Sequence, residues 1–319
     1  STPSGPRDEI IIIGCYVDDL FILSTHTDKH SIYTEFTTQL QKDWDVDDEG
    51  PVQDLLNVEI SRDGSDVLLK QSAYIEKMMD QFAPDKRTHL PRNQPPSSPD
   101  LAQLVTDALV CTDAIDPFLL KRYQSLVGAL LYCTTQTRPD CAYAVGMLCR
   151  CMAKPTEQLY AAALRVLYYL YVHREIGLRY SASSAPLSGM SDSDWAVKHS
   201  TSGYTFQYMN ATVSWASKKQ PTVALSSTEA EIVAASEASK EALALRGLLN
   251  DLGVEDASPL SLAVDNQSAI AVAYNPEHHN RMKHVARRHF FVRECVENLQ
   301  IVVPFVRSAD NYADFFTKH

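Results

Sequence analysis

Two groups of acidic residues have the types and positions needed to bind divalent cations. Asp18 and Asp19 are adjacent and lie between two apolar runs, residues 10–13 and 20–23. Two strands joined by a short turn would present both carboxylates to one cation. A site that uses two cations for phosphoryl transfer needs a further carboxylate from a neighbouring strand, and only seventeen residues precede Asp18. The sequence therefore predicts that this first cation site is incomplete.

The second group consists of four acids in the second half of the chain. They are Asp192, Glu229, Asp265 and Asp314. Two of them lie at the ends of predicted strands, one lies in the first turn of a long predicted helix, and one lies in the last predicted helix. If these positions meet at one edge of a sheet, the acids would bind two Mg²⁺ ions about 3.5–4 Å apart and hydrolyse a phosphodiester by in-line attack of water.

Each of these acids also has a purely structural interpretation. Glu229 has the spacing of a capping box with Ser226. Glu231 has the same spacing from Thr228. The two acids at strand ends could cap a following helix or belong to a turn. Spacing alone leaves both interpretations open.

The elements that must position these residues are predicted to form an α+β / α/β multidomain protein. Residues 1–83 read as strands and helices of a half-complete α+β domain, and residues 84–116, rich in proline, read as a linker or long loop. Residues 117–176 have helical periodicity. Residues 177–319 alternate strands and helices in a pattern that predicts a mixed sheet with flanking helices.

The composition is that of an ordinary globular chain of 319 residues, with 45% hydrophobic and 22% charged residues. No apolar run approaches the roughly 18 residues of a membrane span, so we expect no membrane partner. The seven cysteines are odd in number and form no CxxC pair, which favours a reducing, intracellular setting. The net charge of −11 argues against nucleic-acid binding, but residues 281–293 concentrate basic side chains and aromatic rings. That segment is either a solvated helix face or a phosphate-binding surface.

Several motifs occur in an order that resembles one family. They are residues 16–20 (YVDDL), 123–132 (YQSLVGALLY), 137–140 (TRPD), 165–170 (RVLYYL), 192–196 (DSDWA), 214–231 (SWASKKQPTVALSSTEAE), 265–270 (DNQSAI), 283–284 (KH) and 313–314 (AD). Together they resemble the C-terminal part of the Pol polyprotein of copia-type LTR retrotransposons. The resemblance covers nearly the whole chain.

The resemblance implies a partial reverse-transcriptase palm, a helical thumb-like or connection unit, and an RNase H-like domain that cleaves the RNA strand of an RNA/DNA hybrid. It assigns Asp192, Glu229, Asp265 and Asp314 to the catalytic and metal-binding set, with Mg²⁺ (two ions, Mn²⁺ as a substitute) as cofactor. It adds His284 near the scissile phosphate, where a role in product release or cation exchange stands beside a structural role. Asp18 and Asp19 match the polymerase pair.

The resemblance also implies partners and a location. Nucleic acid would be bound by the basic residues Arg281, Lys283, Arg287 and Arg288. The expected ligands are an RNA/DNA hybrid and a DNA or RNA template-primer, and the expected protein partners are a full-length polymerase subunit or a second copy in a homodimer. The expected location is a cytoplasmic virus-like particle, or the nucleus.

Three departures from the family pattern limit these expectations. The third polymerase carboxylate is missing, Asn57 stands where the primer-gripping hairpin (residues 52–60) has Gly, and Ala286 replaces an acidic residue after His284. We therefore expect a ribonuclease H rather than a polymerase from this chain alone. The alternative is a non-catalytic Pol remnant that binds nucleic acid or pairs with a polymerase subunit.

Overall fold

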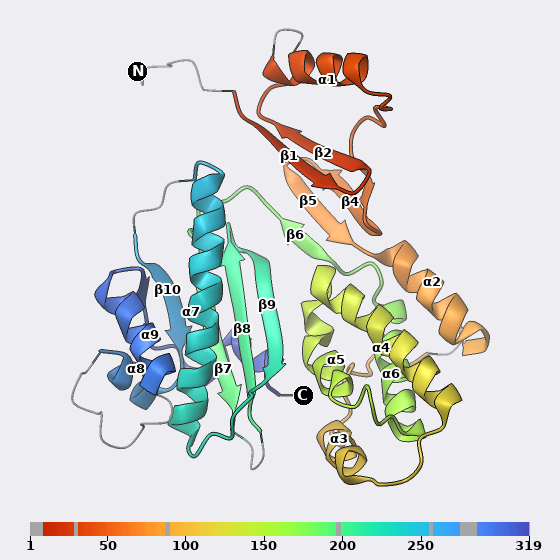
Figure 1. The fold of residues 1–319 in the computed structure, drawn as a ribbon, viewed down its shortest axis with the longest axis vertical. Helices are drawn as coiled ribbons and strands as arrows, with labels where there is room; N and C mark the ends of the chain where they lie inside the picture. Colours follow the sequence, from red (N-terminus) through yellow and green to blue (C-terminus); the bar gives the residue numbers. More distant parts are fainter. Residues whose placement is uncertain are drawn as a thin grey trace. The chain divides into compact units, whose positions relative to one another are not determined.

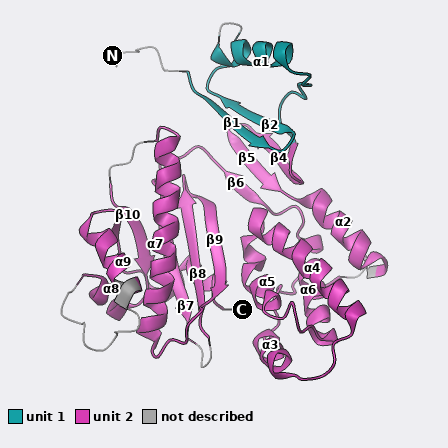
Figure 2. Ribbon diagram, viewed as in Figure 1, with its two compact units in different colours: residues 1–53 teal, residues 54–319 magenta. Residues whose placement is uncertain are grey.

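The computed structural model describes residues 9–28, 31–86, 90–195, 199–254, 258–274 and 286–318. The chain divides into two compact units, residues 1–53 and residues 54–319 (Figure 2). The first unit contains Asp18 and Asp19, and the second contains the four acids predicted to bind cations.

The first unit is a β-hairpin followed by a helix. Its elements are β1 (Ile11–Tyr16), β2 (Asp19–Ser24) and α1 (Ile32–Asp43). The strands pair antiparallel with Tyr16 opposite Asp19, so Val17 and Asp18 form a two-residue turn. Val17 has the left-handed backbone (φ 53°) that such turns require. The predicted hairpin is confirmed, and its turn leaves both carboxylates exposed.

A four-stranded antiparallel sheet begins the second unit. Its order is β3 (Asp54–Leu55), β4 (Val58–Asp63), β5 (Asp66–Lys70) and β6 (Leu178–Tyr180). β6 follows the helices in sequence and returns to pair with β5, with Leu178 opposite Leu69. A Cβ added at Gly177 would lie 2.1 Å from the carbonyl oxygen of Leu69. Only glycine permits this approach of the returning chain to β5.

The hairpin between β3 and β4 tolerates the replacement of glycine by asparagine. Leu56 and Asn57 form its turn with positive φ angles of 54° and 59°. Asparagine adopts this left-handed conformation more readily than most residues, so Asn57 keeps the turn. The departure at this position does not disrupt the hairpin.

The helices between residues 72 and 172 share one hydrophobic core. Figure 1 shows them grouped together. They are α2 (Ser72–Phe82), α3 (Leu101–Val110), α4 (Pro117–Gln136), α5 (Ala142–Cys149) and α6 (Glu157–Val172). α4 begins as predicted at Asp116, whose carboxylate accepts a hydrogen bond from the backbone N–H of Phe118 (3.0 Å). No helix of the described residues is both long enough and apolar enough to cross a membrane.

Residues 84–116 contain more structure than the predicted linker. They include a short 3₁₀ turn, Pro84–Lys86, and α3. Leu101, Val105 and Ala108 of α3 are buried in the helical core. These apolar residues recur at helical spacing just after the proline-rich stretch. The many prolines favoured a linker or loop over the whole range, so α3 was not predicted.

The TRPD motif holds this core together through a buried arginine. The side chain of Arg138 has no exposed surface and binds both carboxylate oxygens of Asp140 (2.9 and 2.7 Å). It also donates to the carbonyl oxygen of His173 (3.0 Å), and the hydroxyl of Tyr169 donates to Asp140 (2.9 Å). The motif thus ties the end of α4 to the end of α6.

A five-stranded mixed sheet forms the rest of the second unit. Its order is β11 (Ile301–Val302), β10 (Leu260–Val264), β7 (Ser188–Asp194), β8 (Thr201–Tyr208) and β9 (Ala211–Lys219). β10 runs parallel to β7 and β11, whereas β7, β8 and β9 are antiparallel. The predicted mixed sheet is confirmed.

Helical segments surround this sheet. They are α7 (Ser227–Asp251), α8 (Gln267–Tyr274), α9 (Ala286–Glu297) and the 3₁₀ segments η4 (Ser308–Asp310) and η5 (Tyr312–Phe316). α7 lies along the sheet and packs on β7, β8 and β10 (Figure 1). η5 packs on β7 and β8. The last predicted helix is therefore a 3₁₀ segment instead of an α-helix.

β9 joins the mixed sheet to the helical core. The indole N–H of Trp215 donates to the carbonyl oxygen of Thr134 in α4 (2.9 Å). A Cβ added at Gly146 of α5 would lie 3.2 Å from the carbonyl oxygen of Ser217, so α5 lies against the strand. The tryptophan of the SWASKK motif therefore has a packing role.

Candidate metal centre

Asp192 lies on the central strand of the mixed sheet and is almost fully buried. Only 2% of its surface is exposed. The hydroxyl of Thr317 donates a hydrogen bond to Oδ2 of Asp192. Asn311 donates from its side-chain amide to the carbonyl oxygen of Ser191 (3.1 Å). The segment after β11 thus packs beside Asp192 and holds its carboxylate.

A glycine makes this approach possible. Gly203 lies opposite Asp192 on β8. A Cβ added there would lie 2.8 Å from Cβ of Phe316 and 2.9 Å from the carbonyl oxygen of Ala313. A real Cβ atom does not lie this close to another heavy atom, so any residue larger than glycine at position 203 would displace η5 from the sheet.

Asp265 comes to the same place through the parallel pairing of β10 with β7. Val264, the last residue of β10, lies opposite Ser191, so the next residue along each strand is an aspartate. The structural alternative for Asp265 was helix capping, but Asn266 does this, because its Oδ1 accepts a hydrogen bond from the backbone N–H of Ala269 (3.0 Å). Asp265 is half-buried.

The glutamate at this site is Glu231 rather than the predicted Glu229. The hydroxyl oxygen of Ser226 caps α7 by accepting from the backbone N–H of Glu229 (3.2 Å). Oε2 of Glu229 accepts from the backbone N–H of Leu225 (2.8 Å), which closes the helix start in the manner of a capping box. Because residues two apart point to different sides of a helix, Glu231 faces the sheet instead.

Glu231 is 5% exposed, and its Oε1 accepts from the backbone N–H of Ser193 (3.3 Å). Its Oε2 has no hydrogen-bond partner among the described residues. A buried carboxylate oxygen without a partner is costly, which is the pattern of a ligand position that a cation would complete. The sequence holds no signal that separates it from Glu229, because Ser226 and Thr228 each precede a glutamate by three positions.

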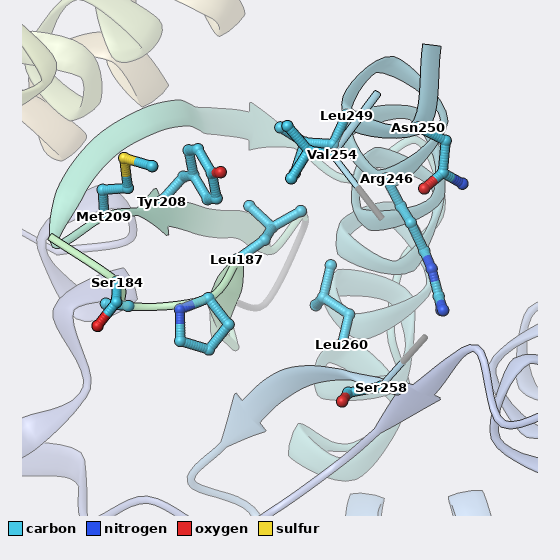
Figure 3. A pocket seen from close by; sticks show the side chains of 12 residues that line it. Ser184, Leu187, Tyr208, Met209, Arg246, Leu249, Asn250, Val254, Ser258 and Leu260 are labelled. Atoms are coloured by element: carbon cyan, nitrogen blue, oxygen red, sulfur yellow. The ribbon is translucent and has the colours of Figure 1, made fainter. Parts of the chain in front are cut away.

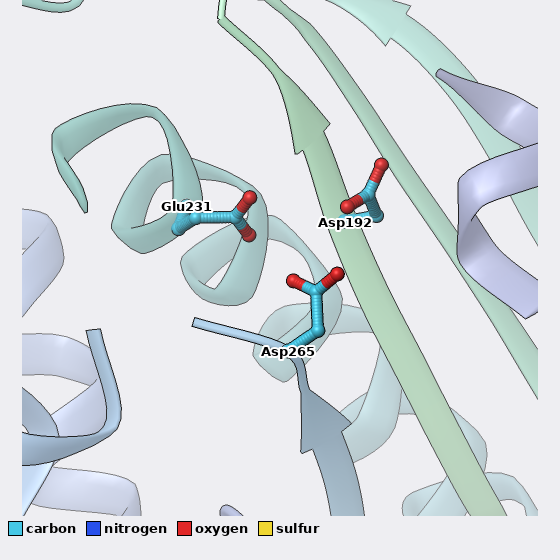
Figure 4. A group of neighbouring side chains, drawn as sticks. All are labelled: Asp192, Glu231 and Asp265. Carbon is cyan, nitrogen blue, oxygen red and sulfur yellow. The ribbon is translucent and has the colours of Figure 1, made fainter. Parts of the chain in front are cut away.

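Asp192, Glu231 and Asp265 form one compact group. One carboxylate oxygen from each lies within 4.8 Å of the others, and this is the group of potential metal ligands that the described residues contain. Figure 4 shows the three side chains converging from α7, from β7 and from the end of β10. Hard divalent cations such as Mg²⁺ prefer carboxylate oxygens, so the group suits such an ion.

The electrostatics of the group would favour a bound cation. Burial raises the pKa of Glu231 to about 8, and the charges of Asp192 and Asp265 add to this effect. Burial also raises the pKa of Asp192, against the lowering effect of the Thr317 hydroxyl and of Lys318. A bound cation would favour the ionised form of both acids and remove the penalty.

Asp314 lies beside this group without being one of its three members. It is half-buried in η5 and forms an ion pair with the ammonium of Lys318. Its negative charge contributes to raising the pKa of Asp192. The predicted fourth acid is therefore near the group, on the side of the sheet where η5 packs.

The predicted nucleic-acid-binding and histidine residues lie mostly outside the described part of the chain. Arg281, Lys283 and His284 fall outside the described residues, and the side chain of Arg287 is not described. The described portion of the basic segment is α9, where Nη1 of Arg288 donates to the hydroxyl oxygen of Thr222 (3.1 Å). Arg288 thus contacts the loop that leads into α7.

The polymerase-type pair is exposed. Asp18 lies in the hairpin turn and Asp19 at the start of β2. Within the described residues, neither belongs to a group of three potential metal ligands. The first unit thus presents two carboxylates, and the described residues supply no third ligand to them.

A separate cavity lies at the other end of the mixed sheet. It has a volume of about 230 Å³ and is lined by the start of β7, the end of β8 and the end of α7 (Figure 3). Its wall includes Leu187, Tyr208, Leu249 and Leu260, with Arg246 as the charged residue. Arg246 donates to the carbonyl oxygen of Gln300 (2.9 Å). None of the described residues that line this cavity carries a carboxylate.

The chain matches known proteins along its whole length. The family model described as "Reverse transcriptase (RNA-dependent DNA polymerase)" matches residues 4–89. The retrovirus-related Pol polyprotein from transposon TNT 1-94 of Nicotiana tabacum is 32% identical over 98% of this chain and 23% of its own length. That from transposon RE1 of Arabidopsis thaliana is 32% identical over 97% of this chain and 20% of its own length.

A shorter relative matches over most of both chains. The putative transposon Ty5-1 protein of Saccharomyces cerevisiae is 33% identical over 74% of each. The chain belongs to the copia-type retrotransposon Pol family. It spans roughly a quarter or less of the two plant polyproteins, as their 23% and 20% coverage shows.

Two solved structures match parts of this chain. The foamy viral protease-reverse transcriptase in complex with RNA/DNA hybrid covers 66% of this chain and 27% of its own, with 13% identity and a TM-score of 0.40. The N-terminal RNase H domain of Rv2228c from Mycobacterium tuberculosis covers 42% of this chain and 91% of its own, with 11% identity and a TM-score of 0.33.

Proposed function

We propose that this chain is a ribonuclease H that hydrolyses the RNA strand of an RNA/DNA hybrid. Asp192, Glu231 and Asp265 would hold one divalent cation, and Asp314 would contribute to a second. The observation that carries the proposal is the unpartnered Oε2 of Glu231, which is buried between two further carboxylates. Membership of the copia-type Pol family supports the choice of substrate.

The positions of the acids support a division of roles. Asp192 is held by Thr317 and Glu231 by the backbone N–H of Ser193, so both carboxylates are fixed before any ligand binds. Such fixed oxygens cost little reorganisation when the cation and substrate arrive. Asp265, half-buried at the end of its strand, has more access to solvent and would orient the attacking water.

The reaction consumes one water for each bond cleaved. The oxygen of the water bonds to phosphorus, the P–O ester bond breaks, and the leaving sugar oxygen takes a proton. Bound Mg²⁺, for which Mn²⁺ can substitute, supplies Lewis-acid chemistry that activates the water and stabilises the leaving oxygen. The protein's own residues orient the water and hold the phosphate against it.

Selection of the RNA strand requires contacts with its 2′-hydroxyl groups. We propose that the hybrid lies along the surface that includes Arg288 on α9, with Arg281, Lys283 and Arg287 as further phosphate contacts. Binding of this kind weakens steeply with salt, because it releases counterions from the phosphate backbone. We further propose that the chain acts within a virus-like particle in the cytoplasm.

Two substitutions separate the catalytic glutamate from the structural one. We expect Glu231→Gln to lower the rate of hydrolysis of a labelled RNA/DNA hybrid by at least a hundredfold in Mg²⁺ or Mn²⁺, because removing one aligned electrostatic group costs roughly 10²–10³ in rate. Glu229→Gln is the matched control, since the amide oxygen of Gln can still accept from Leu225 and the rate should fall less than fivefold.

Equal loss of activity in both variants would contradict the assignment of Glu231. Absence of hydrolysis by the unmodified chain, with salt-sensitive hybrid binding retained, would favour a non-catalytic nucleic-acid-binding role. Polymerase activity is not part of the proposal, because Asp18 and Asp19 have no third ligand among the described residues.

A further inference from the structure

A lysine lies among the carboxylates of the proposed metal centre. Lys318 follows η5 and forms an ion pair with Asp314. The preceding residue, Thr317, is fully buried and donates its hydroxyl hydrogen to Asp192. The backbone at this point is thus fixed to the sheet, while the side chain of Lys318 is half-exposed, with 51% of its surface accessible.

The positive charge of Lys318 acts on more than its direct partner. Asp192 and Asp265, as well as Asp314, interact electrostatically with its ammonium. Asp194, two residues after Asp192 and on the same face of β7, also feels this charge. Near the acid group, a single ammonium therefore offsets negative charge from four carboxylates.

We propose that Lys318 is a positioning residue that serves as an internal counter-ion of the metal centre. It neutralises the acids when no cation is bound, and its charge competes with a second cation for Asp314. This inference rests on the proposed function, because it concerns the same acid group.

The physical reason is competition for one carboxylate. An ammonium and a divalent ion on one carboxylate repel each other, so weakening the ion pair is part of the cost of binding a cation at Asp314. The long, flexible and half-exposed side chain can turn into solvent, while Thr317 keeps the backbone in place. Among the described residues, Lys318 forms its ion pair with Asp314 and not with the three acids of the group, so its charge opposes mainly the binding of the second cation.

The test measures cation binding by the whole chain and does not depend on turnover. Mn²⁺ is titrated into the metal-free protein by isothermal calorimetry, and thermal unfolding is followed with and without Mn²⁺. Lys318→Met should tighten the weaker of two binding events by about threefold to tenfold, since one exposed charge contributes modestly and the cation carries two. Lys318→Met should also lower the unfolding temperature of the metal-free protein.

Lys240→Met is the matched control. Lys240 is exposed to a similar extent, 55% against 51%, and pairs with Glu237 on α7 (2.8 Å), nine positions after Glu231. Lys318→Arg keeps the charge and should bind Mn²⁺ as the unmodified chain does.

The outcomes separate the two proposals. If Lys318→Met and Lys240→Met give the same isotherm, the counter-ion role of Lys318 is refuted, while the proposal that the acid group binds cations is unaffected. If the unmodified chain binds no Mn²⁺, or if Glu231→Gln leaves the tighter event unchanged, the proposed metal centre fails. A shift in substrate KM with an unchanged Mn²⁺ isotherm would assign Lys318 to substrate contact and overturn the counter-ion role.

Discussion

The buried carboxyl of Glu231 should make the metal-free protein lose stability as the pH rises. The pKa of Glu231 is raised from its ordinary value of 4.5 to about 8 in the folded chain. Below pH 4 the group is protonated in both the folded and unfolded states, so it has no effect. Between pH 4.5 and pH 8 the carboxyl of Glu231 loses its proton in the unfolded chain but keeps it in the folded chain, so the free energy of unfolding falls as the pH rises. Above pH 8 the full penalty is present.

The size of this effect follows from the two pKa values. At about 1.4 kcal/mol for each tenfold change in proton affinity, the largest loss in the free energy of unfolding that this pKa difference can cause is about 5 kcal/mol. Because Asp192 and Asp265 share part of this energy, we expect Glu231→Gln to stabilise the metal-free protein by about 3 kcal/mol at pH 9 and by less than about 0.5 kcal/mol at pH 4. Glutamine has the shape of the protonated acid and no charge to bury.

Urea-induced unfolding in EDTA, followed by tryptophan fluorescence from pH 4 to pH 9, measures this difference. The comparison at pH 4 is an internal control, because the two proteins should be nearly equally stable there. Saturating Mn²⁺ at pH 9 should remove the advantage of Glu231→Gln, since the cation stabilises the unmodified chain. Parallel stability curves for the two proteins across the whole pH range would refute the reasoning.

Three further substitutions test the surroundings of the site and the helical core by urea unfolding. Asp140→Asn leaves the buried guanidinium of Arg138 without its counter-charge and should destabilise the protein by about 2 kcal/mol, whereas an unchanged midpoint would contradict its structural role. Gly203→Ala forces a Cβ against Phe316 and should cost about 1–3 kcal/mol and lower Mn²⁺ affinity, because η5 must move. Gly247→Ala, on α7 with open space around it, should instead stabilise the protein by up to about 1 kcal/mol, and a loss of stability would show that α7 is constrained there.

The strands of the proposed metal centre could be predicted because their sequence signals are local. The apolar run before Asp265 is short and ends in an acid, and Asn266 supplies the cap of the next helix. The hairpin around Asp18 was likewise predictable, since two short apolar runs, residues 10–13 and 20–23, flank a polar turn. Parallel pairing of two such strands then brings Asp192 and Asp265 together.

The choice of glutamate could not be made from spacing. Ser226 and Thr228 are equally good caps, and each has a glutamate three positions later. Packing of α7 against the sheet determines which glutamate faces it. Just after β9, the side-chain amide of Gln220 donates to the carbonyl oxygen of Ala230 in α7 (2.9 Å). This long-range contact fixes the rotation of α7 and so directs Glu231 toward Asp192. The position of η5 could not be predicted either, because its packing on the sheet depends on Gly203, which lies far away in the sequence on β8.

The pairing of β6 with β5 determines where the second unit can be divided. β6 belongs in sequence to the chain that leads into the mixed sheet, yet its backbone hydrogen bonds go to β5. Tyr180 also donates from its hydroxyl to the carbonyl oxygen of Thr212 in β9 (2.9 Å). A shortened protein that starts at residue 177 would lack β5, so β6 would be an orphaned strand with an open edge, which favours aggregation. The segment with the mixed sheet is therefore best expressed from residue 54 onward, with the small sheet intact.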